Sequence, residues 1–181
     1  AALLALSDCR RGGELSDRAL RRRMEEAGLD RRDTGLATRL CFGVLQNRML
    51  CDFYIDTFSK IKARRMEEKV LDSLRLGVYQ LLFLDRVPPS AAVSEAVELA
   101  RKYSRSPRAA GLVNGVLRTL LRERDRLPAP PGLAVRYSHP QWLVDAFSSR
   151  LGDQGELEAL LQINNELCGI SIQLVPGRAA P

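Results

Sequence analysis

Residues 74–118 read LRLGVYQLLFLDRVPPSAAVSEAVELARKYSRSPRAAGLVNGVLR. Apolar residues recur in this stretch every three or four positions, which is the spacing that places them on one face of an α-helix. The pairs Pro88-Pro89 and Ser106-Pro107 interrupt the pattern, and proline is accepted in the first turn of a helix but not in its interior. The stretch therefore predicts three successive helices with buried faces. It contains almost no side chain suited to catalysis.

The same periodicity extends the helical prediction over most of the chain. Ser16 is expected to cap a second helix that ends at Gly28, and Asp30 or Asp33 is expected to cap a third that continues to Phe58. The fold class is therefore predicted to be all-α, a helical bundle. The helices are expected at about residues 1–11, 16–28, 30–58, 66–84, 88–103 and 107–124. The predicted core includes Leu74, Leu81, Val93, Val97, Val113 and Leu117.

Residues 127–133, LPAPPGL, interrupt the helical pattern, because three prolines in four positions exclude a helix. We expect one domain over residues 1–126, a linker over 127–137 and a helical connector over 138–181. Two shorter helices are expected in the connector, at about residues 139–151 and 155–164, and Trp142 is expected to anchor them on the bundle. The weak alternation of GISIQLV, residues 169–175, predicts one β-strand.

Composition restricts the classes of function. No apolar run approaches the roughly 18 residues of a membrane helix, and the apolar part of AALLALSDCRRGG at the start is too short for a secretory signal. The four cysteines (Cys9, Cys41, Cys51 and Cys168) show no paired spacing, so no metal site is expected. The single histidine, His139, precedes a proline at an expected helix start, where a structural role is favoured. These features predict a reduced, cytoplasmic protein with no membrane partner.

The net charge is +6, and only four of the 28 basic residues are lysine. An arginine excess favours a phosphate-bearing partner, because guanidinium grips phosphate oxygens in pairs; a GC-rich genome would produce the same excess without any effect on function. Basic side chains gather in two places. The first group, on the first two expected helices, is Arg10, Arg11, Arg18, Arg21, Arg22 and Arg23. The second, in the expected connection before residue 66, is Lys60, Lys62, Arg64 and Arg65.

Within the first group, Arg18, Arg21 and Arg22 are expected to share a helix face opposite the stripe that carries Leu20 and Met24. Such a face could bind phosphates, and it could equally be an ordinary solvated face, since nearby acidic residues dilute its charge. The second group could be a solvated loop. The residues alone leave these alternatives open.

Several segments together resemble one family. Residues 36–55 (LATRLCFGVLQNRMLCDFYI), 79–100 (YQLLFLDRVPPSAAVSEAVELA) and 111–118 (GLVNGVLR) resemble the third-, fifth- and sixth-helix regions of NusB-like domains. Residues 136–147 (RYSHPQWLVDAF) and 160–166 (LLQINNE) resemble the segment that joins such a domain to the catalytic domain in bacterial ribosomal RNA cytosine-5 methyltransferases of the Sun/Fmu type. The resemblance covers nearly the whole chain.

The resemblance implies an RNA-binding domain that positions RNA, ribosomal RNA in particular, for a catalytic domain. It implies RNA contacts from basic residues near the N-terminus, here Arg10, Arg11, Arg18, Arg21 and Arg22. Lys60, Lys62, Arg64 and Arg65 are a second candidate set for RNA contact. The alternatives are a free-standing NusB-type antitermination factor, which would bind nascent RNA with a ribosomal protein partner, and a protein-interaction bundle.

The departures from the methyltransferase pattern concern its chemistry. Residues 172–175 (IQLV) stand where those enzymes have a strand with an Arg and an Asn, and the glycine-rich loop for S-adenosylmethionine is absent. No Pro-Cys or Thr-Cys motif supplies the thiolate that cytosine-5 methylation requires, and neither Cys9 nor Cys168 lies in such a context. We expect no catalytic residue and no cofactor in this chain, with S-adenosylmethionine implied only for a catalytic domain outside it.

Overall fold

The computed structural model describes residues 1–12 and 15–166, and every regular element within these ranges is helical, as predicted. The strand expected at residues 169–175 lies outside the described residues. Seven helices form the bundle: α1 (Ala2–Gly12), α2 (Ser16–Glu26), α3 (Arg31–Gln46), α4 (Arg48–Phe58), α5 (Glu68–Phe83), α6 (Pro89–Tyr103) and α7 (Ala109–Arg122). Three follow it: α8 (Leu133–Arg136), α9 (Gln141–Leu151) and α10 (Gln154–Asn164). Short 3-10 helices span Ala63–Arg65 (η1) and Arg124–Arg126 (η2).

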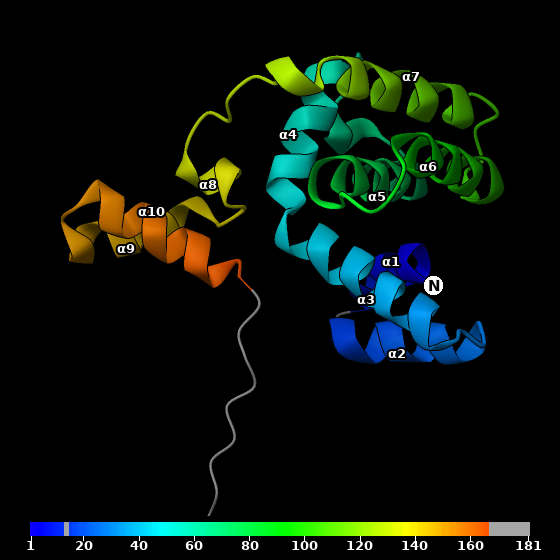
Figure 1. Cartoon of the computed structure of the whole chain (residues 1–181), viewed down its shortest axis with the longest axis horizontal. Helices are drawn as coiled ribbons and strands as arrows, with labels where there is room; N and C mark the ends of the chain where they lie inside the picture. The colour runs from blue at the N-terminus through cyan, green and yellow to red at the C-terminus, as the bar shows by residue number, and fades with distance from the viewer. Residues whose placement is uncertain (13–14, 167–181) are drawn as a thin grey trace, which may run out of the picture.

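Helix α5 is the centre of the bundle. Every residue from Val70 to Leu81 is buried, and a helix that is buried all round must be enclosed by other elements. It packs against α1, α3, α4, α6 and α7 (Figure 1). Gly77 of α5 allows both α6 and α7 to approach α5 closely, because a Cβ atom there would lie 2.5 Å from Leu117 Cδ1 and 3.2 Å from Ala96 Cβ.

The predicted core is confirmed with one exception. Val97 is half-buried at the edge of α6. The other members of the predicted set are buried: Leu74, Leu81, Val93, Val113 and Leu117.

The single helix expected from Asp30 to Phe58 is wrong, because the chain breaks it at Asn47. Asp30 does cap α3, where its carboxylate accepts from the backbone amides of Arg32 and Asp33 at 2.8 Å each. At the break, Asn47 has φ −105° and ψ 24°, and its side chain donates to the carbonyl of Gly43 at 3.0 Å. Asparagine competes with backbone hydrogen bonding in this way, so α4 leaves α3 in a new direction (Figure 1).

The expected cap of α2 is also wrong. Ser16 is the first helical residue, Leu15 occupies the cap position, and no side chain there accepts a hydrogen bond from the first turn. The first turn is favoured instead by the negative charge of Asp17 near the positive end of the helix dipole. The expected start of α6 at the Pro88-Pro89 pair is confirmed, with Pro89 as its first residue.

The three last helices form a smaller unit beside the bundle (Figure 1). Helix α8 falls within residues 127–137, the stretch for which we expected a linker. The smaller unit has a hydrophobic core of its own, separate from that of the bundle, made of Ala134, Val144, Leu157 and Leu161. Trp142 does not anchor this unit: its side chain is 70% exposed, and the prediction that it packs on the bundle is wrong.

Polar contacts attach the smaller unit to the junction of α3 and α4. The backbone amide of Leu50 donates to Ser138 Oγ at 3.1 Å, and Gln46 Nε2 donates to the carbonyl of Asn165 at 2.8 Å. Asn165 Nδ2 in turn donates to the carbonyl of Tyr137 at 2.8 Å, which joins the end of α10 to α8. Three of these residues, Tyr137, Ser138 and Asn165, come from the segments 136–147 and 160–166, so those segments shape the contact between the two units.

Candidate nucleic-acid interface

The exposed side of α2 carries the first group of basic side chains. Leu20 is buried against the bundle, and Arg18 and Arg21 are fully on the solvent side. Neither arginine has an ion-pair or hydrogen-bond partner in the part of the chain that the structure describes. Together with the partly exposed Arg22 they form a cationic surface, here called the α2 basic face. The predicted face of the helix is therefore present.

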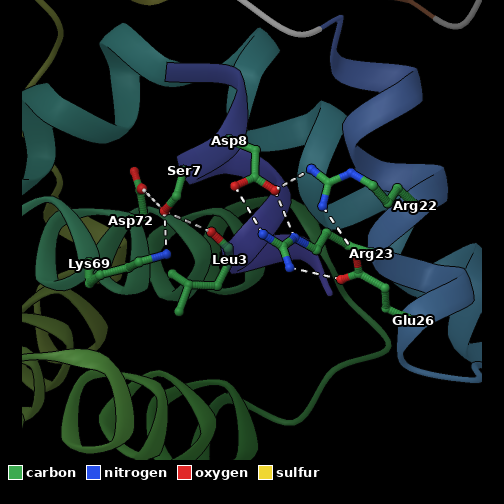
Figure 2. A network of polar contacts seen from close by, with 8 residues as sticks. All are labelled: Leu3, Ser7, Asp8, Arg22, Arg23, Glu26, Lys69 and Asp72. Atoms are coloured by element: carbon green, nitrogen blue, oxygen red, sulfur yellow. Dashed lines mark hydrogen bonds and ion pairs between the residues drawn. The ribbon is translucent and has the colours of Figure 1, made fainter. Parts of the chain in front are cut away.

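Arg22 and the neighbouring Arg23 are held by carboxylates (Figure 2). Asp8 on α1 accepts from Arg22 at 2.9 Å and from Arg23 Nε at 2.7 Å, and Glu26 accepts from both arginines at 3.2 and 2.8 Å. The hydrogen bond from Arg23 is the main reason that the pKa of Asp8 is lowered, and it lowers the pKa of Glu26 in the same way. The two carboxylates therefore offset much of the charge that these two arginines bring to the face.

Arg10 is directed inward rather than toward α2. It pairs with Asp72 of α5, a side chain that is 1% exposed, and it is itself 29% exposed. Asp72 also accepts from Arg75 at 3.0 Å, and Arg75 forms two hydrogen bonds of 2.7 Å with Asp52. Burial acts to lower the pKa of Arg75, but the carboxylates of Asp52 and Asp72 outweigh it and raise that pKa.

A second set of contacts joins α1 and α5 beside this chain of ion pairs (Figure 2). Lys69 Nζ donates to Ser7 Oγ at 2.7 Å, and the Ser7 hydroxyl lies 3.2 Å from the carbonyl of Leu3 and 3.5 Å from Asp72. Buried polar groups require such partners, so the middle of α1 is tied to the centre of the bundle. The side chain of Arg11, another residue for which we expected RNA contact, lies outside the described residues.

The second basic group surrounds η1. Lys60, Lys62, Arg64 and Arg65 are all exposed. Asp56 fixes the segment from its inner side. Its carboxylate accepts from the backbone amide of Ala63 at 2.6 Å, and its backbone carbonyl accepts from Lys62 Nζ at 3.0 Å. We call this group the η1 cluster, and it follows the last turn of α4. Helix α4 runs from the end of α3 toward α7 and away from α2 (Figure 1). The fold therefore does not combine the two basic groups into one surface.

Helix α3 contributes basic side chains that the sequence pattern did not single out. Arg31, Arg32 and Arg39 are exposed on it, and α3 packs directly beside α2. Arg31 and Arg32 directly follow Asp30, the residue expected to cap this helix. Their place at a helix start was a signal by which the sequence could have singled them out. Arg39 carried no such signal, because its exposure depends on how α3 lies on α5.

A hollow of about 930 Å³ lies between α3, the start of α4, the end of α5 and the smaller unit. We call it the α3–α10 groove. Its walls are made by the following residues: Gly35, Thr38, Arg39, Phe42, Gly43, Gln46, Asn47, Leu50, Tyr79, Phe83, Arg136, Tyr137, Gln162, Asn165 and Glu166. The sequence could not reveal it, because its α3 wall and the smaller unit that faces this wall are far apart along the chain.

The described residues offer little for catalysis. They contain no group of three or more side chains suited to holding a metal ion, and none of their helices is long and apolar enough to cross a membrane. Burial raises the pKa of both Cys41 and Cys51 to about 12, so neither is a nucleophile near neutral pH. His139 is buried, and its Nδ1 bonds the carbonyl of Tyr137 at 2.7 Å, a structural role.

Comparison with known proteins yields one family and two kinds of relative. The NusB family model matches residues 1–122. The chain is 37% identical over 139 residues to ribosomal RNA small subunit methyltransferase B of Escherichia coli O1:K1 / APEC, which covers 75% of this chain and 31% of that protein. It is 35% identical over 156 residues to a Bacillus subtilis protein called "Probable ribosomal RNA small subunit methyltransferase B", covering 83% and 34%. The chain thus spans about a third of the length of these curated relatives.

Solved structures are similar to the bundle. The chain superposes with a TM-score of 0.60 on a crystal structure of antitermination factors NusB and NusE in complex with dsRNA, at 26% identity, over 67% of this chain and 90% of that one. A chain in a crystal structure of a plectonemic RNA supercoil gives a TM-score of 0.63 at 26% identity, over 70% and 93%.

Proposed function

Because this chain belongs to the NusB family, we propose that it binds RNA through the α2 basic face and the neighbouring arginines of α3. The observation that carries the proposal is that Arg18 and Arg21 are exposed and have no carboxylate partner among the described residues. Guanidinium groups placed in this way bind phosphate oxygens. A net charge of +6 favours the approach of a polyanion.

We further propose that the RNA is ribosomal and that the chain serves a ribosomal RNA methyltransferase. The alignment with the Bacillus subtilis relative covers 83% of this chain, so it extends past the residues that match the NusB family. The smaller unit of α8–α10 likewise follows the residues that match the NusB family. This supports the methyltransferase branch over a free-standing antitermination factor with a ribosomal protein partner. The exposed arginines support RNA binding over a bundle that binds only proteins.

The methyl donor S-adenosylmethionine does not fit the described residues. Nucleotide cofactors of this kind are bound where a glycine-rich turn joins a strand to a helix, and the described ranges contain helices and no strand. Under the proposal, the chain holds RNA, and the transfer of the methyl group belongs to another part of a longer methyltransferase.

The test is a charge reversal at the two unpaired arginines, Arg18→Glu with Arg21→Glu. Binding to a fragment of small-subunit ribosomal RNA should weaken sharply at low salt, and the difference should shrink as salt rises, because counterion release drives such affinity. The plot of log affinity against log salt should become shallower by about 0.7 to 0.9 for each phosphate that the variant no longer neutralises. Arg22 is left in place, because a glutamate there would face Asp8 and Glu26.

The matched control is Arg64→Glu with Arg65→Glu, which changes the net charge equally in the η1 cluster. The proposal expects a much smaller loss of affinity from this variant. A loss confined to the control would move the RNA to the η1 cluster. The absence of RNA binding by the parent chain at low salt would favour a protein-interaction bundle.

A further inference from the structure

The α3–α10 groove combines aromatic walls with a basic rim. Phe42 is 38% exposed on its α3 side, although it is a large apolar residue. Tyr79 and Phe83 stack with ring centroids 5.1 Å apart and an interplanar angle of 22°, and they form the α5 wall. Tyr137 provides an aromatic ring from the smaller unit. An exposed aromatic ring in a hollow is a surface on which a flat ligand can stack.

The rim is positively charged. Arg39 lines the groove and has no ion-pair partner among the residues that the structure describes. Arg136 lies over the ring of Tyr137, 5.4 Å from its centroid, and pairs with Glu158 at 2.8 Å while remaining 56% exposed. The lining contains one carboxylate, that of Glu166. An anionic ligand would therefore meet one unpaired and one half-exposed guanidinium.

The groove also presents hydrogen-bond acceptors. Gln46 uses its side-chain nitrogen for the contact with the smaller unit, and Asn165 uses its own for the contact with Tyr137 within that unit, at 2.8 Å each. No donor within the described ranges reaches the side-chain oxygen of Gln46 or Asn165. Because no buried side-chain oxygen lacks a partner, both of these oxygens are accessible to solvent. Amino groups on the edge of a nucleobase are suitable donors for such oxygens.

We propose that the α3–α10 groove binds unpaired nucleotides of RNA, with a base stacked on Phe42 and the adjoining phosphate at Arg39. Aromatic stacking beside a cationic groove is the usual chemistry by which proteins hold single-stranded nucleic acid. The volume of about 930 Å³ lies in the range of small-ligand sites. This inference rests on the proposed RNA-binding function and adds a second site that discriminates by strandedness.

Continuity with the α2 side favours RNA over a protein as the occupant. Arg32, Arg39, Phe42 and Gln46 recur on α3 at helical spacing, with Gly35 between the first two. Nothing lies within 4 Å of a Cβ atom built on Gly35, so this stripe is open to solvent. It leads from the end of α3 that follows α2 to the groove at its other end. One RNA strand could follow it with its phosphates on the arginines.

The experiment compares two RNAs, an unstructured oligonucleotide and a perfect duplex, on the full chain and its variants. Phe42→Leu keeps an apolar side chain but removes the stacking surface. It should weaken binding of the unstructured RNA about tenfold, the order expected when a base no longer stacks on an aromatic ring, and leave duplex binding unchanged. Arg39→Gln should also weaken binding of the unstructured RNA. The control Trp142→Leu removes an aromatic side chain that is 70% exposed outside the groove, and should change neither affinity.

Failure of this inference and failure of the proposed function give different results. If Arg18→Glu with Arg21→Glu weakens both RNAs while Phe42→Leu weakens neither, the α2 basic face binds RNA and the groove does not. In that case the groove is better explained as a surface for a protein partner. Binding of cytidine 5′-monophosphate, followed by the amide NMR signals of Phe42, Gly43 and Asn165, is a second measurement that does not depend on a variant's stability. Undisturbed signals at millimolar nucleotide would overturn the proposal.

Discussion

The ring of Tyr79 lies against the Cα of Gly43, so that a methyl group on this glycine would lie 2.0 Å from Tyr79 Cζ. Gly43 is in α3 and Tyr79 is in α5, and this contact sets how closely the two helices approach. The same pair forms part of the α3–α10 groove. The packing of α3 on α5 and the shape of the groove therefore both depend on a glycine at position 43.

We predict that Gly43→Ala destabilises the protein, although alanine is the better helix former. The clash with Tyr79 should cost about 1–3 kcal/mol or more, whereas the gain from helix propensity is at most about 1 kcal/mol. Urea unfolding should show a lower midpoint. Gly115→Ala in α7 is the control, because nothing lies within 4 Å of its Cβ position, and it should leave stability equal or higher. Equal stabilisation by both variants would contradict the packing argument.

A second prediction concerns Asp72, which is 1% exposed between Arg10 and Arg75. Asp72→Ala leaves the buried Arg75 with Asp52 as its only remaining carboxylate partner among the described residues, and should lower the free energy of unfolding by about 3–5 kcal/mol. The control is Glu98→Ala, which breaks an ion pair with Arg101 whose two side chains are 57% and 63% exposed. Exposed pairs contribute at most about 1 kcal/mol. Similar losses of stability from the two variants would show that Asp72 is not the centre of the network.

The cysteines give a third prediction. Burial raises the pKa of Cys41 and Cys51 to about 12, so at pH 8 almost no thiolate is present at either. In the native protein neither should react with a thiol reagent, and both should react once urea unfolds the chain. The reagent should be applied to a Cys9→Ser, Cys168→Ser variant, so that other thiols do not contribute. Rapid native labelling at either position would mean that the core opens locally.

Trp142 is the only tryptophan, which makes its environment directly measurable. Its side chain is 70% exposed, so acrylamide should quench its fluorescence nearly as well as that of free tryptophan. Strong protection from acrylamide in the isolated chain would restore the anchoring role that the sequence suggested.

Periodicity was sufficient to predict the bundle and most of its core. Leu74 and Val113 lie on apolar stripes that can point only inward, so their burial follows from the pattern. The break at Asn47 could not be predicted, because apolar residues continue at helical spacing on both sides of it. Its cause is a local hydrogen bond from the asparagine side chain.

The candidate site was less predictable than the fold. Helical spacing was enough to place Arg18 and Arg21 on one face. It could not show that Arg10 pairs with Asp72 or that Arg23 pairs with Asp8, since those partners lie 62 and 15 residues away. The α3–α10 groove forms where α3 lies opposite a unit from a distant part of the chain. The spacing of residues within one helix cannot predict a contact between such distant segments.

The last substitution concerns Asp8, which holds Arg22 and Arg23 away from ligands. Asp8→Asn should remove one of the two carboxylates that hold Arg22 and Arg23, with Glu26 remaining, and should strengthen RNA binding at low salt, because the less strongly held guanidinium groups can then reach phosphates. Asp17→Asn is the control: it makes the same change in net charge on α2 at an exposed carboxylate without a partner in the described residues. Equal gains from the two variants would mean that net charge alone, and not release of the arginines, sets the affinity.

The same substitution should alter how stability depends on pH. The hydrogen bond from Arg23 lowers the folded-state pKa of Asp8 below its unfolded value. The resulting stabilisation is fully present above the unfolded pKa, about 3.9, and is lost as the pH falls through the folded pKa. The parent chain should therefore be more stable than the Asp8→Asn variant at pH 7, and the difference should narrow in acid below about pH 4. Urea titrations at a series of pH values measure it. A difference that stays constant down to about pH 2, well below the unfolded pKa, would show that Asp8 contributes by packing and not by its charge.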